Sequence, residues 1–417
     1  MSNWFTPPVS GEVSLEEIEE MASSGKFHEW NFEPFESQEN GYEDVLDEIK
    51  KYSAVDYLAL EEKYKLANQS GNVEEASKYK SEMEAMVDAV LKIYREKDIL
   101  PIQYYSDFGI MDEIEKCISY KAKFDGNTVS CGAGIGTTLC NYLFPNIFDT
   151  PSAHDLEKKN ARSLYEKFHN DEYLRRAIKF CFSYKDGCPV PTNVMGGLRL
   201  VGSAPTNFRP MNAKAVYERF CPKGGVIYDF CMGFGGRMLG ALSSKNNYRY
   251  VGTDPCTETF YHLNQLGEWI ESVTGREDSY ELHCCGSEDF RGPANSVDFA
   301  FSSPPYFNLE VYSDEETQCY NKFPELEQWL EGYVRQTIKN IYHMLKPGAL
   351  YAVNIADFKV GSGREVAYVD EWKRISEEEG MALFDTVYLG VTARAGSAEQ
   401  AAGELKKENI MLFKKSM

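Results

Sequence analysis

The sequence predicts an α/β protein with an open, mostly parallel sheet in its C-terminal half and a mainly helical N-terminal region. From Gly225 onward, short apolar segments of strand type alternate with amphipathic segments of helix type, the pattern of βα units. A glycine-rich loop follows the first of these strands directly. Between Glu43 and Lys97, apolar residues recur at three- and four-residue spacing, which predicts helices.

The N-terminal region is expected to contain separate helices. Ser14 to Ser23 forms the first, because Ser14 and Glu17 match a capping box. The helical stretch between Glu43 and Lys97 is interrupted at Asn68 to Asn72, which predicts an antiparallel hairpin of two helices. Two further helices are expected at Ser152 to His169 and Asp171 to Tyr184.

The C-terminal region is expected to form a sheet of seven strands. We predict strands at Gly225 to Asp229, Tyr248 to Gly252, Tyr280 to Cys284, the apolar run that ends at Ser302, Ala349 to Ile355, Leu383 to Gly390, and Asn409 to Lys414. Helices are expected at Asn212 to Phe220, from Arg237 onward, and at Thr257 to Thr274, Pro324 to Leu345 and Val366 to Glu379.

The chain of 417 residues is too long for one small core, so we predict two domains. The glycine-rich stretch Gly196 to Pro205 is the expected boundary, giving a helical N-terminal domain over residues 1–195 and an α/β domain over residues 196–417. No run of eighteen apolar residues exists and no basic leader precedes an apolar core, so a cytoplasmic protein without a membrane partner is expected. The eleven scattered cysteines predict reduced, mostly buried thiols and no metal site.

The net charge of −21 is unfavourable for a protein that binds a polyanion. Residues 1–100 carry 10 basic and 23 acidic side chains, so most of the excess lies in that region. A basic stretch lies further on, in Lys158, Lys159, Arg162, Lys167, Arg175, Arg176, Lys179 and Lys185. It is interpreted either as solvated helix faces or as a set of phosphate contacts.

The stretch Ser296 to Glu310 has the most specific pattern in the chain. Its apolar half is a buried strand, and Ser302 and Ser303 are followed at once by Pro304 and Pro305. Proline fixes φ and donates no hydrogen bond, so the chain must leave the sheet there and hold Tyr306 at the carboxyl end of the strand. In open α/β sheets this edge is where ligands bind.

A second pattern lies upstream, where Asp229-Phe230-Cys231-Met232-Gly233-Phe234-Gly235-Gly236 follows the first strand. Its glycines allow a ligand to approach the backbone, and a helix N-terminus follows them. Strand two ends near Asp254, an acid well suited to bind a ribose diol. A dinucleotide-binding enzyme would share this glycine loop and acid.

Together, the glycine loop and Ser303-Pro304-Pro305-Tyr306 resemble the motifs of the DNA amino-methyltransferases, over roughly residues 205–417. The resemblance implies the Rossmann-like seven-stranded sheet of class I methyltransferases, S-adenosylmethionine as cofactor, and double-stranded DNA as partner. It implies that the tetrad Ser303, Pro304, Pro305 and Tyr306 is catalytic. The cofactor residues that it implies are Arg209, Asp229, Cys231, Gly233, Gly235, Gly236, Asp254, Ser287 and Glu288. Which of Ser287, Glu288 and Asp289 contacts the adenine stays open.

The expected reaction is direct methyl displacement onto an exocyclic amino nitrogen of a flipped base. The Ser303 side chain and the Pro304 carbonyl would accept the two amino protons. Serine at the first tetrad position favours N4 of cytosine over N6 of adenine. Such an enzyme would serve restriction-modification or phage DNA modification in a bacterial or phage-infected cell, with the N-terminal region in target recognition or in binding a nuclease or other protein.

Two alternatives remain open. One is methylation of RNA or of a protein glutamine amide, and the other is a scaffold that keeps the fold without catalysis. A further glycine-rich stretch, Cys131 to Thr138, is interpreted as a turn or substrate-facing loop rather than a cofactor site, because the polar segment Lys123 to Ser130 before it is a poor buried strand.

Overall fold

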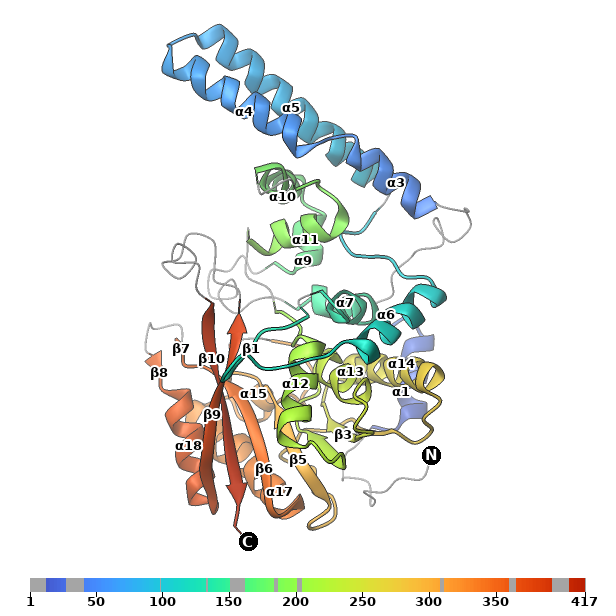
Figure 1. Cartoon of the computed structure of the whole chain (residues 1–417), viewed down its shortest axis with the longest axis vertical. Helices are drawn as coiled ribbons and strands as arrows, with labels where there is room; N and C mark the ends of the chain where they lie inside the picture. The colour runs from blue at the N-terminus through green and yellow to red at the C-terminus, as the bar shows by residue number, and fades with distance from the viewer. Residues whose placement is uncertain are drawn as a thin grey trace. The chain divides into compact units, whose positions relative to one another are not determined.

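The computed structural model describes residues 13–27, 41–97, 99–132, 134–150, 162–183, 187–200, 205–307, 311–359, 365–391 and 405–416. The chain forms two compact units, each assembled from separate stretches of sequence (Figure 1). The sheet unit comprises Met1–His28, Tyr105–Ile147 and Thr206–Met417, and the helical unit comprises Glu29–Tyr104 and Phe148–Pro205. The sheet unit therefore includes stretches that precede residue 196 in the sequence.

The sheet unit is built on an eight-stranded sheet with the order β1-β9-β10-β6-β5-β2-β3-β4. Its strands are β1 (Thr128–Val129), β2 (Val226–Asp229), β3 (Arg249–Thr253), β4 (Tyr280–His283), β5 (Val297–Ser302), β6 (Leu345–Ile355), β9 (Met381–Val391) and β10 (Lys406–Lys415). Strand β10 runs antiparallel to β6 and β9, and the other neighbours are parallel. Without β1, this is the Rossmann-like sheet of class I methyltransferases, and the predicted fold class is confirmed.

The strand count of seven was one too low. Strand β1 is only two residues long and pairs in parallel with β9, Thr128 opposite Tyr388 and Val129 opposite Leu389. Its neighbours in sequence are polar, so no alternating pattern marks it, and only Val129 is fully buried. The following glycine-rich stretch then leads into helix α7 (Thr137–Leu143).

Helices cover both faces of the sheet. Figure 1 shows α12, α13 and α14 on one side and α17 and α18 on the other. The helices of this unit are α1 (Leu15–Ser23), α6 (Asp107–Ser119), α7, α12 (Pro210–Phe220), α13 (Gly236–Leu242), α14 (Thr257–Thr274), α15 (Cys319–Lys322), α16 (Leu326–Trp329), α17 (Gln336–Met344) and α18 (Tyr368–Glu378). A 3₁₀ turn, Pro145–Phe148, spans the point in the sequence where this unit gives way to the helical one. A short hairpin of β7 (Phe358–Lys359) and β8 (Glu365–Val366) lies apart from the main sheet.

The predicted helix Pro324 to Leu345 is interrupted by a π-helical segment, Leu330–Arg335, between α16 and α17. Gly332 lies within it, where an added Cβ would come within 2.3 Å of the Phe323 ring. The segment carries Tyr333, and Trp329 precedes it. Apolar periodicity cannot distinguish such an inserted turn from a continuous helix.

Lys214 of α12 connects this helix to α6 through hydrogen bonds. Its side chain is 2% exposed, and its ammonium donates to the Cys117, Ile118 and Tyr120 carbonyls at 2.7, 3.0 and 3.0 Å. These carbonyls lie at the C-terminal end of α6, where backbone acceptors lack helical partners. Residues 107–119 are therefore an integral part of the sheet unit.

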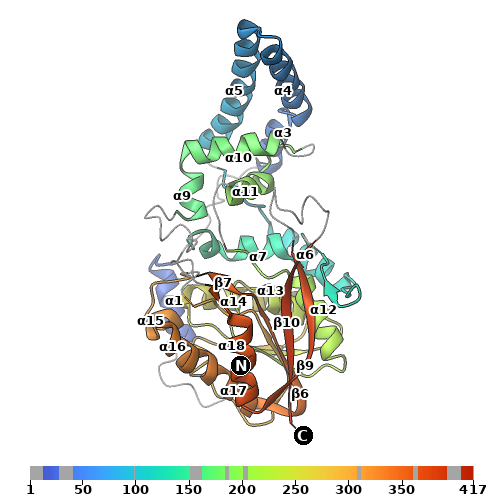
Figure 2. The same cartoon turned by 90° about the vertical axis from the view of Figure 1, so that its left-hand side faces the viewer.

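The helical unit contains α3 (Gly41–Lys50), α4 (Ala54–Gln69), α5 (Val73–Glu96), α9 (Leu164–Phe168), α10 (Asp171–Ser183) and α11 (Pro191–Leu200). Helices α4 and α5 form the predicted hairpin (Figure 2), and Tyr57 of α4 stacks on Phe182 of α10 at 4.8 Å between ring centroids. Within the stretch Gly196 to Pro205, where the boundary was expected, Gly196 and Gly197 belong to α11, and Gly197 lets this helix approach Ala177 of α10. The helical unit ends at Pro205. Residues 152–161 of the predicted helix Ser152 to His169 lie outside the described residues, and α9 covers part of the rest.

None of the eleven cysteines forms a disulfide, and eight of them are buried, as predicted. No helix in the described part of the chain has the length and apolarity needed to cross a membrane.

Candidate functional site

The glycine loop and the diproline bend leave the sheet from neighbouring strands. Strands β2 and β5 are parallel and adjacent, with Ile227 opposite Phe299 and Tyr228 opposite Ala300. Because carboxyl ends of parallel strands meet at one edge of a sheet, residues 230–235 and 303–306 emerge side by side. The two predicted motifs therefore meet at a single edge.

Asp229 connects the two motifs. Its carboxylate is fully buried and accepts hydrogen bonds from four donors. Ser302 Oγ and the Cys231 amide donate to Oδ1 at 2.7 and 3.4 Å, and Arg237 Nε and the Tyr250 hydroxyl donate to Oδ2 at 2.9 and 2.7 Å. Ser302 Oγ also lies 3.2 Å from the Cys231 carbonyl. The carboxylate thus holds the loop and the strand end together.

Arg237 completes this buried network. Its side chain is 5% exposed, and besides the Asp229 contact it donates to the Cys231 carbonyl. Burial would lower the pKa of this guanidinium, but the Asp229 carboxylate outweighs it and holds the pKa above its usual value. The guanidinium therefore stays charged, and its contacts with Asp229 and Cys231 join the two ends of the loop from Phe230 to Gly235.

The three glycines of the loop have different surroundings. Gly235 has φ +74°, and a Cβ there would meet Leu266 and Phe144 at 2.6 and 2.7 Å. At Gly236, a Cβ would lie 1.9 Å from the Phe208 carbonyl oxygen. Gly233 has φ +55°, and a Cβ there would find only Arg237 Nη2, at 4.0 Å. Packing within the chain requires Gly235 and Gly236, whereas Gly233 borders open space.

Asp254 lies just beyond β3 and contacts the same loop. Its carboxylate accepts from the Gly233 amide at 2.8 Å and from the Cys256 amide at 3.1 Å. Burial raises its pKa to about 6, the two amides oppose this, and the nearby Asp229 and Glu315 carboxylates add to it. The predicted acid and the predicted glycine loop are therefore in direct contact.

The segment before α12 lies against the glycine loop. Asn207 Nδ2 donates to the Phe234 carbonyl at 2.6 Å, and the Phe208 ring lies under the Arg237 guanidinium at 5.6 Å. Arg209 is the N-terminal cap residue of α12 and is partly exposed. Its side chain therefore starts next to the glycine loop.

Ser287 and Glu288 follow β4 and differ in their contacts. The Ser287 hydroxyl is bonded to Thr337 Oγ1 at 2.8 Å, so the protein itself uses it. Glu288 is 5% exposed; Lys322 donates to its Oε1 at 2.5 Å, and its buried Oε2 has no hydrogen-bond partner among the described residues. Lys322 also pairs with Asp289 at 2.5 Å. Of the three candidates, Glu288 is the one with a buried oxygen left to accept a hydrogen bond.

The tetrad is held from several sides. Ser303 Oγ lies 3.5 Å from Asn354 Oδ1, the Tyr368 hydroxyl donates to the Pro305 carbonyl at 3.3 Å, and the Ala356 amide donates to the Tyr306 hydroxyl at 3.1 Å. The Tyr306 ring lies 5.5 Å from the Tyr368 ring. Within the described parts of the chain, no donor bonds to the Pro304 carbonyl.

Several residues at this edge gave no sequence signal. Phe307, directly after the tetrad, has φ +48°, a strained conformation for an aromatic residue, and its ring contacts Trp329 at 5.8 Å. Tyr333 OH lies 2.9 Å from Cys231 Sγ. Burial holds the Cys231 thiol pKa far above its usual value, so the thiol stays protonated. These contacts join distant segments, and no local pattern encodes them.

Glu315 is a further acid that the sequence did not mark. It accepts from the Thr257 amide at 3.3 and 3.2 Å and from Thr257 Oγ1 at 2.5 Å, at the start of α14. Thr317 Oγ1 donates to the Pro255 carbonyl at 3.1 Å. The segment after the tetrad therefore runs across the carboxyl end of β3, next to Asp254.

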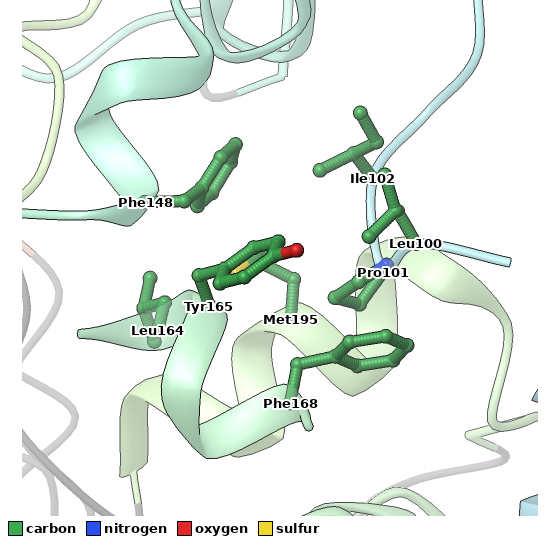
Figure 3. A pocket seen from close by; sticks show the side chains of 8 residues that line it. All are labelled: Leu100, Pro101, Ile102, Phe148, Leu164, Tyr165, Phe168 and Met195. Atoms are coloured by element: carbon green, nitrogen blue, oxygen red, sulfur yellow. The ribbon is translucent and has the colours of Figure 1, made fainter. Parts of the chain in front are cut away.

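Other candidate sites offer less chemistry. In the helical unit an apolar hollow (Figure 3) is lined by Leu100, Pro101, Ile102, Phe148, Leu164, Tyr165, Phe168 and Met195. It carries no charged side chain, so we assign it no reaction. In the described ranges, no group of three His, Cys, Asp or Glu residues is arranged to bind a metal ion.

The stretch Cys131 to Thr138 packs against its own unit. The Cys131 amide donates to Asn212 Oδ1 at 2.8 Å, and the Gly136 amide donates to Glu113 Oε1 at 2.8 Å. At Gly132, an added Cβ would come within 2.4 Å of Met211. Gly132 and Gly136 therefore serve close packing on α12 and α6.

The basic stretch is largely paired with carboxylates inside the helical unit. Arg175 bonds to Asp88 and, at 2.9 Å, to Glu84; Lys179 bonds to Glu84 at 2.5 Å. Arg176 pairs with Glu172 of its own helix at 2.5 Å. These cations contribute less to attracting a phosphate than unpaired ones would. Lys158, Lys159 and Lys185 lie outside the described residues.

No protein-family model matches the chain, and no curated protein matches it in sequence. Among solved structures, it is similar to 1,6-didemethyltoxoflavin-N1-methyltransferase of Burkholderia thailandensis, bound to 1,6-didemethyltoxoflavin and S-adenosylhomocysteine (12% identity, 49% of this chain and 77% of that chain, TM-score 0.33). It is also similar to a phosphoethanolamine N-methyltransferase of Haemonchus contortus (16% identity, 52% of this chain and 56% of that chain, TM-score 0.33). A third similar structure is the [4+2]-cyclase SpnF (15% identity, 50% of this chain and 82% of that chain, TM-score 0.35). These likenesses concern the fold alone, so function has to be argued from the site.

The Asp229 network generates a prediction about stability. Replacing Asp229 by Asn turns the new NH₂ group toward groups that are themselves hydrogen-bond donors, because all four partners of the carboxylate donate. It also leaves the buried positive charge of Arg237 uncompensated. We expect a loss of about 3–5 kcal/mol in the free energy of unfolding, the usual effect of breaking a buried ion pair from one side. Urea unfolding followed by tryptophan fluorescence measures it. Asp314→Asn, at an exposed carboxylate, is the control and should change stability little; equal stability of both variants would contradict the network's role.

Proposed function

We propose that the sheet unit transfers a methyl group from S-adenosylmethionine to an exocyclic amino nitrogen of a DNA base. The observation that carries this proposal is the junction of glycine loop and tetrad on β2 and β5, bridged by the Ser302 hydroxyl and the Asp229 carboxylate. The methyl group and the atom that accepts it must lie about 3–3.5 Å apart before transfer, and motifs that leave the ends of adjacent strands can hold two ligands that close.

The residues fit this cofactor. Asp254 offers a carboxylate for a ribose diol, Gly233 borders open space on the same loop, and Glu288 has a buried oxygen without a partner for an adenine amino group. Arg209, which starts next to the loop, would pair with the methionine carboxylate. S-adenosylmethionine would supply an electrophilic methyl group on a sulfonium centre.

The tetrad fits an amino group as acceptor. An exocyclic amine is a weak nucleophile because its lone pair is delocalised into the ring. Hydrogen bonds from its two protons to Ser303 Oγ and the Pro304 carbonyl would favour a tetrahedral nitrogen with a localised lone pair. The Tyr306 ring, fixed at its hydroxyl by the Ala356 amide, would stack on the flipped base. The Ser at the first position favours N4 of cytosine over N6 of adenine.

A second candidate is methylation of RNA or of a protein glutamine amide, which offers the same two N–H donors. The pairing of Arg175 and Lys179 with Glu84 and Asp88 favours the glutamine amide among these, because a protein substrate, unlike RNA, needs no basic groove. For the DNA reading, we propose the N-terminal region as the part that recognises the target or a partner such as a nuclease.

The proposed function is tested by incubating the full chain with methyl-tritiated S-adenosylmethionine and, separately, sheared DNA of mixed sequence, RNA and a cell extract. Label in DNA, followed by nucleoside analysis, identifies the base. Label only in RNA or protein supports the second candidate. No label in any acceptor, with intact cofactor binding, overturns both.

Cofactor affinity should depend on pH through Asp254. Only the ionised carboxylate accepts both diol protons, and burial raises its pKa to about 6. The dissociation constant of S-adenosylhomocysteine should therefore be flat between about pH 7 and 8 and rise by up to about tenfold per pH unit below about pH 6. Calorimetric titration measures it. Asp254→Asn should bind weakly with little pH dependence; a wild-type constant that is level from pH 5 to 8 contradicts the role.

Tyr306→Ala should spare cofactor binding and lower turnover. The ring is expected to contact the acceptor base, and stacking on an aromatic side chain contributes about 1–3 kcal/mol per base. We expect kcat to fall about 10- to 100-fold, while the dissociation constant of S-adenosylhomocysteine stays unchanged. Tyr306→Phe keeps the ring but loses the hydrogen bond from the Ala356 amide. Its kcat should fall less than that of Tyr306→Ala, and the difference separates the effect of stacking from that of the hydrogen bond. Normal turnover by Tyr306→Ala would refute stacking.

A further inference from the structure

Asn354 lies beside the tetrad at the carboxyl end of β6. Strand β6 runs between β5 and β10 (Figure 1), and Ser302 pairs with Val353, so Asn354 stands next to Ser303. Its side chain is 2% exposed. Neither sequence motif includes it.

The orientation of the Asn354 amide follows from its partners. Nδ2 lies 2.9 Å from the Asn409 carbonyl oxygen of β10, and a carbonyl only accepts, so the NH₂ group must face it. Oδ1 then faces Ser303 Oγ, 3.5 Å away. An amide oxygen also only accepts, so the Ser303 hydroxyl must donate to it. The 3.5 Å separation is longer than the about 2.5–3.0 Å usual for O–H···O hydrogen bonds, and bonds between catalytic groups often shorten only when the substrate binds.

The direction of this bond determines what Ser303 can do. With its proton directed at Asn354, Ser303 Oγ presents lone pairs to a ligand. The Pro305 carbonyl already accepts from Tyr368, and the Tyr306 hydroxyl accepts from the Ala356 amide. Ser303 Oγ and the Pro304 carbonyl are therefore two acceptors at the tetrad that can receive protons from a ligand.

We propose that Asn354 is a positioning residue that fixes Ser303 as a hydrogen-bond acceptor and thereby selects acceptor groups with two N–H donors. An amino or amide nitrogen can donate one proton to Ser303 Oγ and one to the Pro304 carbonyl. A carbonyl or phenolate oxygen has no proton to donate and would be repelled by the lone pairs of both acceptors. This rests on the proposed function and deepens it, because it names the residue that enforces the chemical class of the substrate.

The test is a double-mutant cycle on the full chain with Asn354→Leu, Ser303→Ala and the double variant. Tritium transfer to sheared DNA gives kcat, and calorimetry gives the S-adenosylhomocysteine constant. Asn354→Leu should lower kcat about 10- to 100-fold, the usual cost of a misoriented catalytic group. Its effect on the binding constant should stay below about threefold, because Asn354 contacts the tetrad and not the glycine loop.

The cycle separates positioning from a general structural role. If Asn354 acts through Ser303, adding Asn354→Leu to Ser303→Ala should lower kcat no further. Additive losses, or normal turnover by Asn354→Leu, would overturn the assignment.

Failure of the proposed function is distinguishable from failure of this assignment. If wild type labels RNA or protein instead of DNA, the cycle is run on that acceptor, because the N–H chemistry is the same. If wild type labels nothing, the proposed function is overturned. Thermal unfolding of wild type, the two single variants and the double variant then tests whether Asn354 bonds to Ser303. A double variant that loses less in Tm than the two single losses combined supports the Ser303–Asn354 bond; additive losses overturn it.

Discussion

The buried carboxylate of Asp229 is the interaction on which the candidate site depends. It lies at the end of β2 and collects donors from its own loop, from α13, from β3 and from the end of β5. A charge with no exposure to water is tolerated only when such partners compensate its lost hydration. Because each partner comes from a different element, the carboxylate fixes the geometry of the whole sheet edge. The separation between glycine loop and diproline bend follows from it.

The sequence was sufficient for features with a local cause. The strands around the glycine loop follow from short apolar runs, and the bend at Pro304 and Pro305 follows from proline's missing donor. Helix α14 was predicted with its observed bounds, because Gly275, which adopts φ +64°, ends it. The adjacency of the two motifs also follows, since a topology with parallel β2 and β5 brings their carboxyl ends together.

Features with a tertiary cause could not be predicted. Gly197 lies in the stretch expected to form the domain boundary, but its role is to let α11 contact Ala177, and only the packed structure shows this use of a glycine. Strand β1 exists because β9 offers an edge, and two residues carry no periodicity. Asp229 matched a cofactor motif, but its four donors all come from the protein. No sequence pattern marks Asn354, because its contacts are with Ser303 and Asn409, 51 and 55 residues away in sequence.

The strained residue Phe307, which directly follows the tetrad, is part of what makes the tetrad rigid. Phe307 holds φ +48°, which an aromatic residue adopts only when its surroundings enforce it. The enforcing contact is Trp329, which directly precedes the π-helical segment and also stacks near Tyr368 at 5.4 Å. Tyr368 in turn bonds the Pro305 carbonyl. The insertion in the helix, the strained aromatic and the occupied carbonyl thus form one continuous support. This support fixes the bend through contacts within the chain itself, as the proposed methyl transfer to a weakly nucleophilic amine would require, since such an amine has to be held in line with the methyl group.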